Sequence, residues 1–87
     1  MTIVEDFRNY CVQTLEVNFG QLSGDIVKGV NSKKDLNEKS SINDFNEFIY
    51  LIEVNISVFS GRYKATQICN NIRTKAMEFV GKQNVIR

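Results

Sequence analysis

The chain has 87 residues, of which 43% are hydrophobic and 24% charged, and its formal net charge is +1 at pH 7. This balance is typical of one globular domain and argues against disorder. The sequence contains no His, the side chain that most often serves as a general base or metal ligand near neutral pH. We therefore expect no catalytic activity, no metal site and no bound cofactor.

Residues 1–30 predict a first helical hairpin. Thr2 and Glu5 have the spacing of a capping box at the start of its first helix. The second, shorter helix is expected to begin at Ser23 or Asp25. The first helix would bury the apolar residues that recur every three, four or seven positions, namely Val4, Phe7, Cys11, Leu15 and Leu22.

Residues 31–41 predict a solvated linker, because Leu36 is their only apolar residue. Ser41 is expected to cap the next helix, with Asp44 three residues later. Residues 42–81 then predict a second hairpin. Its two helices would bury Ile42, Phe45, Ile49, Ile52, Ile56 and Phe59 in the first, and Ala65, Ile68, Cys69, Ile72, Ala76, Phe79 and Val80 in the second.

A break is predicted at Ser60 and Gly61. The apolar stripe before this pair is centred about half a turn away from the stripe after it, so one straight helix could not direct both stripes to a single core. A hairpin that ends its first helix at a glycine could do so. Gly81 is expected to end the last helix, which leaves residues 82–87 as a loose tail.

These elements predict an all-α domain, a bundle of about four helices built as two helical hairpins. An alternative stays open, because apolar and polar residues alternate over residues 50–58 as they do in strands. In that case the fold would be α+β, with residues 14–19 paired to residues 50–58 as two strands.

The two hairpins also contain similar sequences. Residues 15–24 and residues 52–61 both end in Ser-Gly, and both contain a Glu-Val-Asn triplet. Such internal similarity suggests one supersecondary unit that is used twice.

The cysteines and the start of the chain indicate a cytosolic protein. Cys11 and Cys69 lie in apolar stripes, where we expect buried reduced thiols; a Cys11–Cys69 disulfide is the alternative. Glu5, Asp6 and Arg8 interrupt any apolar run that could serve as a signal peptide. No stretch approaches the length of a membrane span, so no membrane partner is expected.

A second apolar stripe gives the candidate interaction surface. In a helical reading of residues 42–60, this stripe lies on the side roughly opposite the core-facing one. A helix that is apolar on two sides is usually buried on both, and so short a chain would take its second layer from another subunit. The stripe consists of Leu51, Val54 and Val58. We therefore expect a non-catalytic protein-interaction or adaptor module that acts as a homo-oligomer.

Charge is distributed unevenly along the chain. Residues 1–60 contain five Lys/Arg and nine Asp/Glu, a net charge of −4, whereas residues 61–87 contain six Lys/Arg and one Glu, a net charge of +5. The alternative function is therefore a nucleic-acid-binding regulator. Its candidate basic surface is Arg62, Lys64, Arg73, Lys75 and Lys82.

The position of these cations favours a different role for them. They border the apolar stripe of the last helix instead of covering its exposed face, where a helix that follows phosphates would concentrate them. Cations at such a border usually lay their stems over the core and pair with nearby acidic residues. The acidic residues available on the preceding helix are Asp44, Glu47 and Glu53.

Overall fold

The structure, a computed structural model, describes the backbone of residues 3–85 and the side chains of residues 3–81. Residues 3–85 form four helices and no strand. The helices are α1 (Ile3–Phe19), α2 (Leu22–Lys33), α3 (Ile42–Ser60) and α4 (Arg62–Val85). The predicted all-α bundle of two helical hairpins is therefore confirmed.

The alternative α+β fold is wrong, because residues 14–19 lie in α1 and residues 50–58 lie in α3. In α3 the helical period prevails over the alternating one. Ile49, Ile52 and Ile56 share one helical face, and all three are fully buried. The helix also satisfies its backbone hydrogen bonds internally, whereas a lone strand would need a partner for them.

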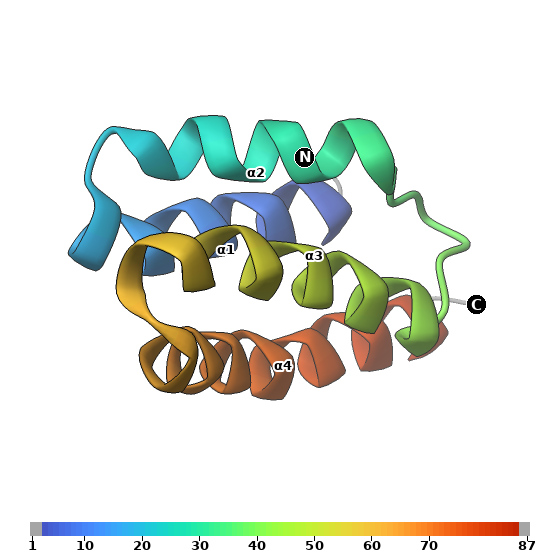
Figure 1. The fold of residues 1–87 in the computed structure, drawn as a ribbon. Helices are drawn as coiled ribbons and strands as arrows, with labels where there is room; N and C mark the ends of the chain where they lie inside the picture. Colours follow the sequence, from blue (N-terminus) through green and yellow to red (C-terminus); the bar gives the residue numbers. More distant parts are fainter. Residues whose placement is uncertain (1–2, 86–87) are drawn as a thin grey trace.

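The four helices run up and down in sequence and form a closed ring (Figure 1). Each helix has two direct neighbours in this ring, since α1 lies beside α2 and α4, and α3 lies beside α2 and α4. The bundle measures 39 × 21 × 21 Å between its Cα atoms. Both hairpin turns lie at one end of the long axis, and the loop between α2 and α3 lies at the other end (Figure 1). We call these the turn end and the loop end.

Aromatic rings from three helices pack together in the core, in the half of the bundle nearer the loop end. The ring of Phe7 in α1 lies edge-on to the rings of Phe45, Phe48 and Phe79, with centroid distances of 4.9, 6.0 and 5.6 Å. Edge-to-face pairs at such distances are favourable beyond the area that they bury. The remaining buried apolar residues around them are Val4, Cys11, Leu15, Val27, Val30, Leu36, Ile49, Ile52, Ile56, Ala65, Ile68, Cys69, Ile72 and Ala76.

The connection between the hairpins is shorter and less solvated than predicted. Residues 31–33 are the last residues of α2, so the linker comprises residues 34–41. Leu36, the one apolar residue of the linker, is buried in the core. The loop is thus anchored at its centre by an apolar side chain, which stabilises the packing of one hairpin on the other.

The start of α3 is as predicted. The Ser41 hydroxyl accepts a hydrogen bond from the backbone N–H of Asp44, and the Asp44 carboxylate accepts one from the backbone N–H of Ser41. This reciprocal pair is a capping box, which satisfies two donors that the first turn of a helix leaves free. The other predicted capping box includes Thr2, which lies outside the described residues.

The first hairpin turns earlier than predicted. Gly20 has a φ of 56° and ends α1, and α2 already begins at Leu22. Ser23 and Asp25 therefore lie inside the first turn of α2 and do not cap it. Leu22 belongs to α2 and is half-exposed, so its assignment to the buried stripe of α1 was wrong. The left-handed conformation, which glycine adopts without strain, places the break at Gly20.

The second hairpin turns at Gly61, as predicted. This residue has a φ of 86° and a ψ of 157°, a backbone conformation that is essentially restricted to glycine. The predicted end of α4 at Gly81 is wrong, because the helix continues to Val85. Gly81 does not adopt a positive φ, so it only lowers the helix propensity locally and does not end the helix.

The two similar sequences do not occupy equivalent places. Ser60 and Gly61 form the turn of the second hairpin, whereas Ser23 and Gly24 lie within helix α2. The turn of the first hairpin is at Gly20, four residues earlier in the matched segment. Two helical hairpins are present, but the sequence similarity does not align their turns.

Candidate interaction surface

Exposed apolar side chains are concentrated at the turn end of the bundle. Among the described residues, eight large apolar side chains are exposed, and five of them lie within one helical turn of Gly20 or Gly61. Val58 is 81% exposed, Phe59 66% and Leu22 50%. Together with the partly buried Phe19, these five form what we call the turn-end patch: Val17, Phe19, Leu22, Val58, Phe59 and Tyr63.

The two hairpins meet within this patch. The rings of Phe19 at the end of α1 and Phe59 at the end of α3 pack edge-on with a centroid distance of 6.5 Å. A shallow hollow of about 390 Å³ lies beside them. It is lined by Asn18, Phe19, Leu22, Phe59, Ser60 and Lys64, which come from all four helices or their ends. Phe19, Leu22 and Phe59 thus form one surface across the seam between the hairpins.

Phe59 was predicted to belong to the buried stripe of α3, and its exposure corrects that prediction. The helical periodicity places it correctly on the core-facing side of α3, but it lies in the last turn, next to the end of α1 at Phe19. Helix α2 likewise exposes Leu22 in its first turn. Helical periodicity predicts on which face of the helix a residue lies. It does not predict how far the core extends along the helix axis. The closeness of Phe59 to Gly61 is the sequence signal that could have indicated this exposure.

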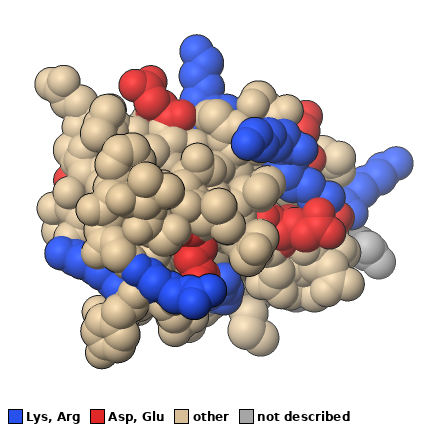
Figure 2. Space-filling view, viewed as in Figure 1, with Lys and Arg blue, Asp and Glu red and all other residues tan. Residues whose placement is uncertain are grey.

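The structure exposes only part of the interaction surface that the sequence predicts on α3. Val54 is 47% exposed and Val58 is largely exposed, both on the side of α3 away from the core. Leu51 instead packs partly against the core and offers less free surface. Figure 2 shows that the half of this face nearest the turn end is mostly uncharged, with Lys and Arg along its lower edge. Val58 connects the predicted α3 stripe to the turn-end patch.

At the turn end, the charged residues of the first hairpin are acidic and those of the second hairpin are basic. The last turn of α1 and the first turn of α2 carry Glu16 and Asp25, whereas the first turn of α4 carries Arg62 and Lys64. The last turn of α3 has no charged residue. All four charged side chains are exposed, and none forms an ion pair with another described residue.

The five cations of the predicted basic surface are not all free to bind a partner. Arg73 donates to Glu53 at 2.7 Å, as the border position of the cation had suggested. Lys75 pairs with Glu78 at 3.0 Å, and its Nζ lies 5.7 Å from the centroid of the Tyr10 ring. Arg62 and Lys64 are exposed at the turn end, while the side chain of Lys82 lies outside the described residues. Two of the five candidate cations are thus neutralised within the chain.

Asp44 and Glu47 pair with a different cation than predicted. Both carboxylates contact Lys34 Nζ, at 2.9 and 3.1 Å, and thereby hold the end of α2 to the start of α3. Hydrogen bonds to these carboxylates raise the pKa of Lys34 above its ordinary value. The backbone hydrogen bond from Ser41, followed by that from Lys34, lowers the pKa of Asp44. Both carboxylates thus help to hold α2 and α3 together.

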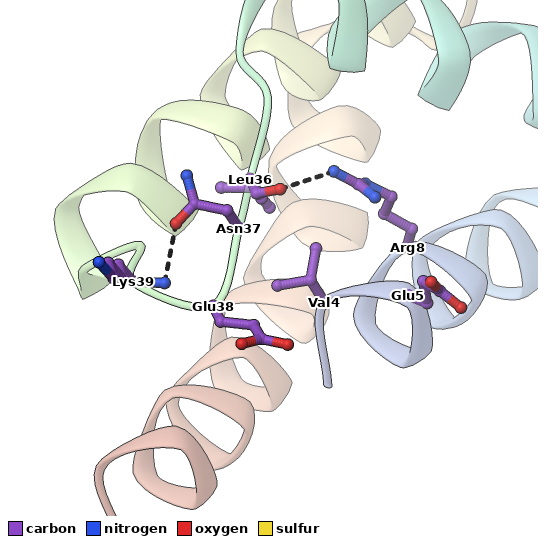
Figure 3. A pocket seen from close by; sticks show the side chains of 7 residues that line it. All are labelled: Val4, Glu5, Arg8, Leu36, Asn37, Glu38 and Lys39. Carbon is purple, nitrogen blue, oxygen red and sulfur yellow. Dashed lines mark hydrogen bonds between the residues drawn. The ribbon is translucent and has the colours of Figure 1, made fainter. Parts of the chain in front are cut away.

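A hollow of about 500 Å³ lies at the loop end (Figure 3). Arg8 extends from α1 and donates from Nη2 to the Leu36 carbonyl and to Asp35 Oδ1, both at 2.9 Å. The other charged lining residues are Glu5, Glu38 and Lys39. Because acidic and basic side chains balance in the lining, the hollow selects neither an anion nor a cation. Arg8 holds the loop against α1, and the hollow results from the way the loop packs on this helix.

Both cysteines are buried and free, so the predicted reduced thiols are found and the alternative disulfide is not. Burial raises the pKa of Cys11, with a further contribution from the neighbouring Cys69. Burial also raises the pKa of Cys69 to about 12, reinforced by Glu53 and opposed by Arg73. Thiols with raised pKa values are poor nucleophiles at neutral pH.

Other kinds of site have no counterpart in the part of the chain that the structure describes. Residues 3–81 contain no cluster of three or more Cys, Asp or Glu side chains that could hold a metal ion. In the same part of the chain, no helix combines the length and apolar character needed to cross a membrane. Comparisons with protein-family models, curated proteins and solved structures found no match.

Proposed function

We propose that this protein is a non-catalytic protein-interaction module that associates with a second copy of itself through the turn-end patch. The observation that carries this proposal is the concentration of exposed apolar side chains at one end of the bundle. Apolar patches that are bordered by polar residues are typical of protein-interaction sites in otherwise well-packed proteins. The free thiols agree with a reducing compartment such as the cytosol.

The energetics favour an occupied patch. Burying one side chain of the size of Val, Leu or Phe contributes about 1.5–3 kcal/mol. An 87-residue chain buries only about 60% of its unfolded surface, so association adds substantially to a small core. The rings of Phe19 and Phe59 already contact each other across the seam, so part of the patch is ordered before a partner arrives. An adaptor that binds a different protein through the same patch remains the second possibility for the partner.

The test replaces one exposed residue within the patch and one outside it. Val58→Lys places a charge on the patch, and a cation near the end of α3 also suits the helix dipole, so the fold should be kept. Met77→Lys is the matched control, because Met77 is 68% exposed and lies on α4 far from the turn end. We expect sedimentation velocity to show weaker self-association for Val58→Lys and unchanged association for Met77→Lys. Equal behaviour of both variants and the wild type would argue against the proposed surface.

The nucleic-acid alternative has less support. Arg73 and Lys75 are engaged with acidic residues of the same chain, so phosphate binding would have to displace these ion pairs. Arg62 and Lys64 alone form a small basic site beside exposed apolar side chains. This combination is less favourable for tracking a phosphate backbone than for forming the rim of a protein interface.

A further inference from the structure

The charges at the turn end differ in sign between the two hairpins. We call the acidic pair Glu16 and Asp25 the acidic edge, and the basic pair Arg62 and Lys64 the basic edge. Glu16 and Asp25 place two negative charges on the first hairpin, and Arg62 and Lys64 place two positive charges on the second hairpin. The apolar seam with Phe19 and Phe59 lies between the hairpins. None of the four charged residues forms an ion pair with another described residue, so all four can form ion pairs with a partner.

Building on the proposed function, we propose that two copies meet turn end to turn end, related by a two-fold axis that runs along the seam between the hairpins. Rotation by 180° about an axis in this surface places the first hairpin of one copy opposite the second hairpin of the other. Residues on the axis meet their own equivalents, as in any isologous interface. Each acidic edge therefore faces a basic edge, and the aromatic seams pack on each other.

The linker and the helix ends beside it are a poorer partner for the turn end than a second turn end is. Among the described residues, none of the exposed large apolar side chains lies in residues 31–49, which form the linker and its flanking helix ends. Several charges there are already used, because Arg8 pairs with Asp35 and Lys34 with two carboxylates. Head-to-tail stacking would also continue into an open fibre, whereas the two-fold arrangement closes at two copies.

The size of the interface sets the expected affinity. The bundle is 21 × 21 Å across its Cα atoms, so one end offers a smaller area than a standard protein interface. Interfaces below ~1,200 Å² in total are typical of weak or transient association. We therefore expect association that requires micromolar concentrations, with charge complementarity fixing the orientation of the copies.

The test uses two double variants that reverse one edge each. In Arg62→Glu/Lys64→Glu both edges become acidic, and in Glu16→Lys/Asp25→Lys both become basic. Each variant alone should associate at least about tenfold more weakly than the wild type, because like charges face each other across the axis. An equimolar mixture should restore association, since every acidic edge then meets a basic one. Lys33→Glu/Lys39→Glu, which reverses two exposed and unpaired charges at the loop end, is the matched control and should associate like the wild type.

The outcomes separate this arrangement from the proposed function. Double variants that each associate like the wild type, while Val58→Lys is monomeric, would overturn the two-fold arrangement and leave the patch as the interface. A mixture that fails to associate, although circular dichroism shows both variants folded, would overturn the arrangement as well. A wild-type chain that stays monomeric up to about 500 µM would overturn the second copy as the occupant, and with it the self-association in the proposed function.

Discussion

At the scale of single residues, a network of hydrogen bonds and ion pairs lies at the loop end. Asp44 completes the capping box with Ser41 and pairs with Lys34, so one carboxylate both starts α3 and holds it to α2. Arg8 plays a similar part for the loop, because it donates to the Leu36 carbonyl while Leu36 itself is buried. Polar contacts thus position the loop end, whereas the turn end presents apolar side chains.

The Asp44 network predicts a dependence of stability on pH. A lowered pKa means that the Asp44 carboxylate contributes stability above its ordinary value of 3.8 and that this contribution is lost as the pH falls through the lower folded-state value. Thermal unfolding should therefore show Asp44→Asn to be less stable than the wild type at pH 7, with a difference that shrinks below pH 3.8. A difference that stays constant down to pH 2 would contradict this origin. Asp35→Asn is the control, because Asp35 is also acidic and paired but lies outside the capping box.

The buried thiols make a second prediction at this scale. Cys11 and Cys69 have raised pKa values, and Cys69 donates weakly to the Ile49 carbonyl at 3.9 Å. An aromatic disulfide reagent at pH 8 should react with neither thiol in the folded protein and with two thiols in denaturant. Rapid reaction of the native protein would contradict the burial. A failure to detect two thiols after unfolding without a reductant would instead revive the Cys11–Cys69 disulfide.

At the scale of the elements, the helices and the break between α3 and α4 could be predicted from the sequence. The periodic apolar residues predict the buried faces, because a helix must turn one face to a core, and Ser41 with Asp44 predicts the start of α3. The start of α2 was misplaced, because Gly20, Ser23 and Gly24 are all able to interrupt a helix and only the backbone φ distinguishes them. The exposure of Phe59 depends on how far the neighbouring helices extend, which local sequence does not contain.

A prediction at the scale of the elements concerns the stability of the fold when Gly61, the glycine at the second turn, is replaced. Gly61→Ala should destabilise the fold by about 1–3 kcal/mol, because an alanine is strained at a φ of 86° and a ψ of 157°. No neighbouring atom lies near the added methyl group, so the cost would be conformational and not steric. Gly29→Ala is the matched control: it lies in helix α2, also in open space, and should stabilise the fold by up to about 1 kcal/mol. Chemical denaturation measures both, and equal effects would contradict the special role of Gly61.

At the scale of the whole molecule, the two ends of the bundle differ in the side chains that they leave exposed and unpaired. At the loop end, ion pairs and the buried Leu36 hold the linker to the helices, while the turn end exposes Phe59 and Val58 between an acidic and a basic edge. The α3 stripe read from the sequence reaches this site only through Val58, because Leu51 is partly buried. Chain-wide charge asymmetry predicted a basic region, and folding divides that region between internal ion pairs and the turn end.

Static light scattering measures the self-association of the wild-type chain without any label or substitution. The molar mass should be measured from about 1 to about 500 µM at low salt, with and without random-sequence duplex DNA. We expect the mass to rise with concentration from 10.0 kDa towards about 20 kDa, the value for two copies, and to be indifferent to DNA. A mass that stays at 10.0 kDa throughout, or that changes only when DNA is added, would show that the chain does not associate with itself through the turn end.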